Sequence, residues 1–175
     1  MKNYQLVNRI DTHFQGQAGN RIFYILIEKN TDICLLWIEK DQLISLGRAC
    51  SQLLADNVVA IEKNIINALE EIEFPLTPSL EINLLRIGVD YLASEDHIII
   101  LFDDQESIEN GESPKLRIEL SRKMTNEFIE KTRLLASTGR PKCPLCHKIV
   151  EEDGNCLFCP KKNGHSKDAD LPKLI

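Results

Sequence analysis

The chain has 175 residues, of which 43% are hydrophobic and 27% charged, as expected for a folded domain with a core and a small appendage. No apolar run approaches the roughly 20 residues of a membrane helix, and the N-terminus lacks the features of a signal peptide, so we expect a cytoplasmic protein with no membrane association. The net charge of −6 is uneven, because residues 1–139 carry −8 and residues 140–175 carry +2. Such an acidic body disfavours binding to phosphate backbones.

Apolar periodicity divides the body into strands followed by a helix, twice over. Alternating or continuous apolar runs predict strands, and apolar residues at helical spacing predict helices. The predicted strands cover residues 4–14, 21–29, 33–40, 80–92, 97–104 and 115–120, and the predicted helices cover 41–56, 58–73 and 121–138. The run at 21–29 is almost entirely apolar, so we expect a central strand buried on both faces.

Turn and cap residues separate these elements. Gly16 is expected in a turn, and the polar residues 93–96 form the loop of a hairpin. Residues 105–114 are polar and contain Pro, Gly and Ser, which predicts a surface loop. Ser121 is a good N-cap for the last helix.

The predicted fold is α+β: a mainly antiparallel sheet with packed helices over residues 1–138, plus a small C-terminal zinc ribbon. The ribbon module spans residues 139–166, and a tail spans 167–175. Without gaps, Leu43, Leu53, Leu54 and Ala55 match Met124, Leu134, Leu135 and Ala136. Either a unit of strands and a helix has been duplicated, or two amphipathic helices share a pattern.

Four cysteines near the C-terminus form the strongest motif of the sequence. Cys143, Cys146, Cys156 and Cys159 follow the pattern C-x2-C-x9-C-x2-C. A two-residue gap lets both thiolates of a pair turn toward one metal, and zinc takes four such ligands at tetrahedral corners. Residues 151–155 supply a hairpin tip between the pairs. The pattern predicts one structural Zn²⁺ per chain.

Other interpretations of this module stay open. The cysteines could be redox-active or disulfide-forming dithiols, although no thioredoxin-like pattern surrounds them. His147 or His165 could replace one cysteine as a ligand. Four thiolates around Zn²⁺ leave a charge of −2, and the nearby Arg and Lys side chains either offset it or form a basic face for a partner. Leu157 and Phe158 could dock a protein or pack on the body.

The rest of the chain offers few candidates for chemistry. His13 and His97 stand alone in sequence, and Cys34 and Cys50 lie among apolar residues as small core side chains. Asp103 and Asp104 end a predicted strand and are expected to be solvated. No acid–base pair or catalytic triad can be assembled from these residues.

Four short segments carry a resemblance to known proteins: "GNRIFYILIEK" at 19–29, "IEKDQL" at 38–43, "GRPKCPLC" at 139–146 and "CPKKNG" at 159–164. They resemble an uncharacterised bacterial family, the domain-of-unknown-function family 3090. The last two are the more specific, because the family shares a C-terminal motif of the form GRPxCPxCG…GHxCPRxNG. The resemblance implies a zinc-containing bacterial protein and brings no established activity.

The chain departs from the family motif at two positions. His147 replaces the glycine after the first cysteine pair, and Cys156 takes the place of a histidine that usually precedes the last cysteine by two residues. The family motif implies three cysteines and one histidine, so this chain is expected to use four cysteines instead.

Three functions are compatible with these features. A closed metal site without a catalytic constellation favours a non-enzymatic protein-interaction module with a protein partner. The basic module could instead bind nucleic acid, which the acidic body and an aromatic content of only 6% disfavour. An enzyme with an unrecognised site in the α+β body is the third possibility.

Overall fold

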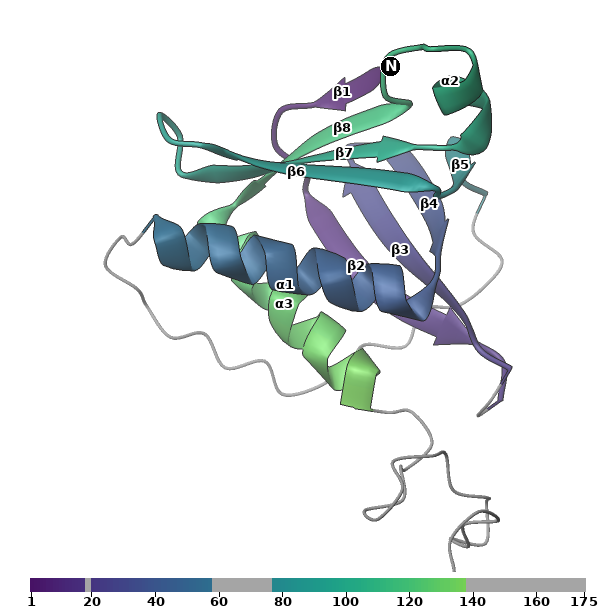
Figure 1. Ribbon diagram of the computed structural model, residues 1–175, viewed down its shortest axis with the longest axis horizontal. Helices are drawn as coiled ribbons and strands as arrows, with labels where there is room; N and C mark the ends of the chain where they lie inside the picture. Colours follow the sequence, from purple (N-terminus) through teal and green to yellow (C-terminus); the bar gives the residue numbers. More distant parts are fainter. Residues whose placement is uncertain (18–19, 58–76, 138–175) are drawn as a thin grey trace, which may run out of the picture. The chain divides into compact units, whose positions relative to one another are not determined.

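The computed structural model describes residues 1–17, 20–57 and 77–137, and Met1–Ser137 form one compact unit. The strands are β1 Lys2–Tyr4, β2 Arg9–Gln15, β3 Ile22–Lys29, β4 Asp32–Ile38, β5 Leu80–Asn83, β6 Arg86–Leu92, β7 His97–Asp103 and β8 Leu116–Ser121, and the helices are α1 Lys40–Asp56, α2 Gln105–Glu109 and α3 Arg122–Ser137 (Figure 1). None of these helices is long and apolar enough to span a membrane. The predicted helix at 58–73, the module at 139–166 and the tail at 167–175 lie outside the described residues.

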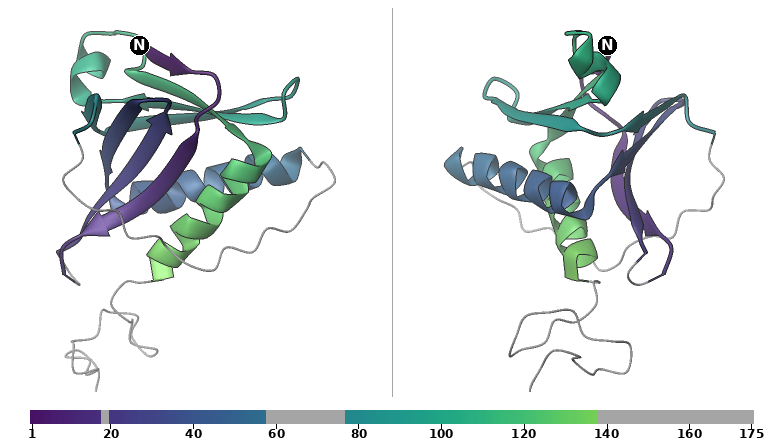
Figure 2. Two further views of the ribbon diagram at one scale, coloured as in Figure 1. Left: turned by 180° about the vertical axis from the view of Figure 1, so that it is seen from behind. Right: turned by 45° about the vertical axis from the view of Figure 1, so that its right-hand side comes forward.

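The described strands form two sheets, so the α+β class is confirmed and the single sheet is wrong. One sheet has the order β1-β8-β7-β6 and the other the order β2-β3-β4-β5. Each sheet contains two antiparallel pairs and one parallel pair, which is β1 with β8 in the first and β4 with β5 in the second. The helices α1 and α3 lie across the open side between the two sheets (Figure 2).

The single sheet was wrong because the predicted strand at 4–14 crosses from one sheet to the other. It is two strands, β1 and β2, joined by residues 5–8. The N–H of Val7 donates to the carbonyl of Glu119 in β8 at 3.3 Å, and the N–H of Asn8 donates to the carbonyl of Glu28 in β3 at 2.8 Å. The chain therefore changes its hydrogen-bonded partner sheet within two residues.

The predicted strand at 80–92 is divided in the same way, into β5 and β6. The N–H of Leu84 donates to the carbonyl of Trp37 in β4 at 2.9 Å, and the N–H of Leu85 donates to that of Asp103 in β7, also at 2.9 Å. Both crossings thus use the same arrangement of hydrogen bonds. The inward-facing positions shift at each crossing, because Val7 is buried where Leu6 is exposed, and Leu85 is exposed between Leu84 and Ile87. The exposed leucines keep the sequence apolar at both points, so the shift is not visible in the sequence pattern.

The two halves of the body repeat one arrangement: a short strand, a three-stranded antiparallel meander and a helix. The short strand of each half pairs in parallel with the last meander strand of the other half. This exchange favours the duplication of a unit and disfavours the alternative, in which two helices merely share a pattern. The buried faces align Leu43 of α1 with Thr125 of α3, one residue later than the match to Met124 in the sequence.

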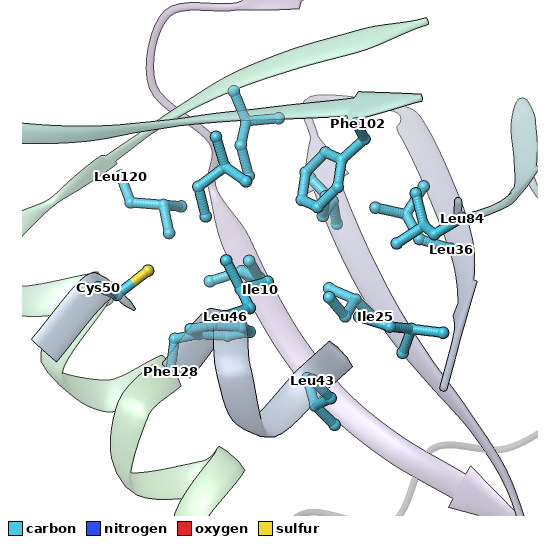
Figure 3. Close-up of a cluster of buried hydrophobic side chains, with 14 of the residues drawn as sticks. Ile10, Ile25, Leu36, Leu43, Leu46, Cys50, Leu84, Phe102, Leu120 and Phe128 are labelled. Atoms are coloured by element: carbon cyan, nitrogen blue, oxygen red, sulfur yellow. The ribbon is translucent and has the colours of Figure 1, made fainter. Parts of the chain in front are cut away.

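One hydrophobic core joins both sheets and both long helices. Figure 3 shows side chains from all of them converging, among them Ile25 of β3, Leu46 of α1 and Phe128 of α3. The predicted burial of β3 on both faces is confirmed, because Tyr24 and Leu26 on its reverse face are also buried.

The predicted limits of the long helices agree with the structure to within one residue. At the start of α1, the Oε1 atom of Gln42 accepts from the N–H of Glu39 at 3.1 Å, as in a capping box. At the start of α3, the Oγ atom of Ser121 accepts from the N–H of Met124 at 3.3 Å. Ser121 is therefore the N-cap that its residue type predicted.

The predicted surface loop at 105–114 is correct for residues 110–114 only, and the predicted solvation of Asp103 is wrong. The segment begins with α2, and the Oδ1 atom of Asp104 caps this helix by accepting from the N–H of Ser107 at 2.9 Å. Asp103 is only 3% exposed, and its Oδ2 atom accepts from Arg86 across the β6–β7 pair at 2.7 Å. A local capping bond and a cross-strand ion pair thus account for both carboxylates.

Arg122 ties the hairpin between β6 and β7 to the end of α1. Its guanidinium contacts Asp96 at 2.7 Å and donates to the backbone carbonyls of Leu54 and Asn57, the latter at 2.5 Å. Arg122 lowers the pKa of Asp96 below its ordinary value. This one side chain therefore holds together segments far apart in the sequence.

Replacing Arg122 by glutamine is expected to lower the free energy of unfolding by about 2 kcal/mol near neutral pH. A carboxylate whose pKa is lowered by folding stabilises the protein above its ordinary pKa, here 3.8, and that contribution disappears as the pH falls. The difference between wild type and variant should therefore shrink in acid. Urea unfolding at about pH 7 and about pH 2.5 measures it, and an equal difference at both would contradict the role given to Asp96.

Candidate functional site

The four cysteines of the predicted zinc site lie outside the described residues, so the zinc stays a prediction. Within the described ranges, no group of three or more His, Cys, Asp or Glu side chains is placed to hold a metal ion. Cys34 and Cys50 are buried free cysteines, as predicted. Burial raises the pKa of Cys50 to about 12, so this thiol stays protonated and is no nucleophile near neutral pH.

Comparison of the two halves of the body points to a second candidate site. When the strand registers and the buried helix faces are superposed, Asp11 of β2 matches Gly88 of β6, and Lys131 of α3 matches Ala49 of α1. At these two matching positions, one half of the body has an Asp and a Lys, and the other half has uncharged residues in the same fold. Polar residues at such positions are candidates for function, because packing alone does not require them.

Asp11 is the centre of this cluster and is 1% exposed. Its Oδ2 atom accepts from the Nε atom of Arg9 at 2.7 Å, and its Oδ1 atom accepts from the Nζ atom of Lys131. Arg9 also faces Glu28 across the β2–β3 pair at 3.8 Å. We call Arg9, Asp11 and Lys131 the Asp11 cluster. Both oxygens of the carboxylate are engaged by cations, so two ion pairs hold Asp11 in place.

The hollow beside the Asp11 cluster differs in chemistry from its counterpart in the other half. It has a volume of about 230 Å³ between β2 and the first half of α3, and Lys123 and Glu127 line it together with Arg9 and Lys131. The counterpart between α1 and β6 measures about 280 Å³. Its lining contains only uncharged residues: Gln42, Ser45, Leu46, Ala49, Ile87 and Val89.

His13 and His97, which stand alone in the sequence, both have neighbours in the structure. The His13 ring stacks on Tyr24 with 5.6 Å between the ring centroids, and Trp37 lies edge-on to the same tyrosine, also at 5.6 Å. The Nδ1 atom of His97 lies 3.6 Å from a carboxylate oxygen of Glu119. His13, Tyr24 and Trp37 form a row across the neighbouring strands β2, β3 and β4, on the reverse face of their sheet. Burial there raises the pKa of Tyr24.

A further polar contact joins the two sheets. The hydroxyl of Tyr4 in β1 donates to Asp32 of β4 at 2.7 Å, and the ammonium of Lys2 lies 3.4 Å from the same carboxylate. Burial and the bond to Asp32 raise the pKa of Tyr4 far above its ordinary value. The tyrosine is therefore a fixed donor that holds β1 in place.

A groove of about 770 Å³ runs between α1 and α3. Gly47, Ile129 and Thr132 line it where the helices meet, and Arg48 and Arg133 line it with exposed side chains. The helices approach closely at Gly47, because a Cβ atom there would lie 2.9 Å from the Cγ2 atom of Thr132. We call this space the α1–α3 groove.

Comparison with known proteins identifies a family but no characterised relative. No curated protein and no solved structure matches the chain significantly. The model of a family described as protein of unknown function (DUF3090) matches residues 2–159, which include the body and all four cysteines of the predicted zinc site. The chain therefore belongs to the DUF3090 family of proteins of unknown function.

Proposed function

We propose that this protein binds one structural zinc ion and acts as a non-enzymatic protein-interaction module. One observation carries the proposal: Cys143, Cys146, Cys156 and Cys159 form two CxxC pairs separated by nine residues. Four thiolates complete the tetrahedral coordination of zinc and leave no position for water or substrate. A cytoplasmic location belongs to the same proposal, because thiols are kept reduced there.

The composition of the cysteine segment supports a role in binding a protein. Leu157 and Phe158 lie between the last two cysteines, in a segment too short to bury many apolar side chains. Five cations flank the cysteines: Arg140, Lys142, Lys148, Lys161 and Lys162. Apolar side chains with a basic border fit an acidic protein surface with an apolar centre.

The body supports binding over catalysis. The carboxylate of Asp11 is engaged by two cations, and the Cys50 thiol is buried and protonated. Nucleic acid is the weaker alternative for the basic segment, because residues 1–139 carry a net charge of −8. An enzymatic role that used the Asp11 carboxylate would first have to break one of its ion pairs.

Removing residues 139–175 is expected to leave the body folded. The core that joins β3, β7, α1 and α3 lies within Met1–Ser137. A chain ending at residue 138 should keep its far-ultraviolet circular dichroism and a cooperative thermal transition. Loss of all secondary structure in the shortened chain would show that the segment belongs to the core.

The interaction role is tested by comparing three forms of the protein as bait in its native host. The full chain should capture a partner that neither the Cys156→Ser variant nor the chain ending at residue 138 retains. Purified partner should then bind the full chain in a chelator-sensitive manner. Equal capture by all three forms would place the interaction on the body and contradict the proposed role of the zinc segment.

A further inference from the structure

We propose that the α1–α3 groove binds a small organic anion: a molecule with one carboxylate, sulfonate or phosphate group on an apolar body. The groove's volume of about 770 Å³ falls within the range of small-molecule sites, roughly 300–1,000 Å³. The described residues form the groove without the cysteine segment. The proposal is therefore independent of zinc.

The charge of the groove differs from that of the body around it. Its lining includes Arg48 and Arg133 and no Asp or Glu. Arg133 contacts Glu130 at 2.5 Å, but both side chains are exposed, so this ion pair is weak. Within the described part of the chain, the Arg48 side chain makes no ion pair or hydrogen bond. The two guanidinium groups make the groove locally positive although the body around it carries a net charge of −8, and a short-range contact with them can hold one small anionic group.

A buried hydroxyl in the groove lacks a partner. Thr132 is 4% exposed, and its Oγ1 atom makes no hydrogen bond to any residue that the structure describes. A buried hydroxyl without a partner costs stability. The matching position in the other half is Cys50, so packing does not demand a threonine there. The oxygen itself has almost no exposed surface, so a ligand beside Gly47 reaches it only if the helices shift slightly apart.

The apolar lining accounts for the rest of the ligand. Ile44, Ile129 and Ala136 line the same groove, which gives an apolar body a surface to cover while its charged group contacts the arginines. This combination of an apolar wall with a few polar groups is typical of sites for small molecules. It fits a small amphipathic anion better than an inorganic phosphate ion.

The test uses the full-length protein and the fluorescent dye anilinonaphthalene sulfonate, which has an aromatic body and one sulfonate. We expect one saturable site, weakened by salt because the arginines are exposed. The double variant Arg48→Gln/Arg133→Gln should weaken dye binding about tenfold. Lys115→Gln removes a cation just before β8, outside the groove, and should leave the affinity unchanged.

Two further measurements make the outcome specific. Phenylnaphthylamine, which lacks the sulfonate, should bind the arginine variant and the wild type equally well. Thr132→Val should weaken dye binding while the melting temperature stays equal or rises, because the buried hydroxyl without a partner is removed. Absence of saturable dye binding would overturn the proposal. So would an equal loss in the arginine variant and in Lys115→Gln, or arginine variants that bind the dye as tightly as wild type.

Discussion

Replacing Cys156 by serine is expected to abolish stoichiometric zinc binding and to unfold residues 140–165 while leaving the body intact. Structural zinc contributes about 10–16 kcal/mol to the folding of small finger peptides. A segment of about 25 residues buries too little apolar surface to fold without such a contribution. Zinc content by elemental analysis and backbone order by nuclear magnetic resonance measure the two parts of this result.

The matched controls are the two histidines near the cysteines. His147→Ala and His165→Ala should each retain one zinc per chain, because the four thiolates complete the coordination. If either histidine variant loses the metal, zinc binding survives but the ligand set is wrong. A metal-free protein in which the segment from Cys143 to His165 is still ordered would contradict the zinc assignment itself.

The Asp11→Ala variant is expected to lose about 3–5 kcal/mol of unfolding free energy, the second large effect. The substitution leaves Lys131, whose side chain is 15% exposed, without the carboxylate that compensates its charge. Lys131→Ala introduces the residue found at the matching position 49, where the other half has no buried charge. The double variant should therefore be more stable than the sum of the single losses predicts, with a coupling of about 1–3 kcal/mol.

Urea unfolding of the four proteins in this cycle measures the coupling. The control is Glu130→Ala, which removes one partner of the exposed ion pair with Arg133 and should cost less than about 1 kcal/mol. Single losses that simply add would show that Asp11 and Lys131 do not act as a pair. If Glu130→Ala lowered the unfolding free energy as much as Asp11→Ala, burial of the ion pair would not explain the large effect expected at Asp11.

The sequence was sufficient to predict most elements but not their arrangement into sheets. Periodicity reports which side of a segment is buried, and both sheets bury their inner faces in one core. The crossings at Val7 and Leu84 interrupt the alternation, but the exposed Leu6 and Leu85 keep the sequence apolar there. The hydrogen-bonded partners that change at these points are distant in sequence. The helix α2 was missed because it is short and polar, although Asp104 was available as its N-cap.

The Asp11 cluster could not be predicted because its members are far apart in the sequence. Asp11 lies in a strand whose alternation suggests an outward position, and it is buried through contact with α3. A sequence signal did exist. If the two halves of the body are aligned with the correct register, Asp11 falls at the position that Gly88 occupies in the other half. The helix match taken from the sequence was shifted by one residue, so it pairs Lys131 with Cys50 instead of Ala49.

X-ray absorption at the zinc edge of the purified full-length protein tests the central claim most directly. The account predicts one zinc per chain, surrounded by four sulfur atoms at about 2.3 Å. These sulfurs belong to Cys143, Cys146, Cys156 and Cys159, so the Cys156→Ser protein should lack this spectrum. A shell containing nitrogen or oxygen, or a protein purified under reducing conditions without zinc, would contradict the account.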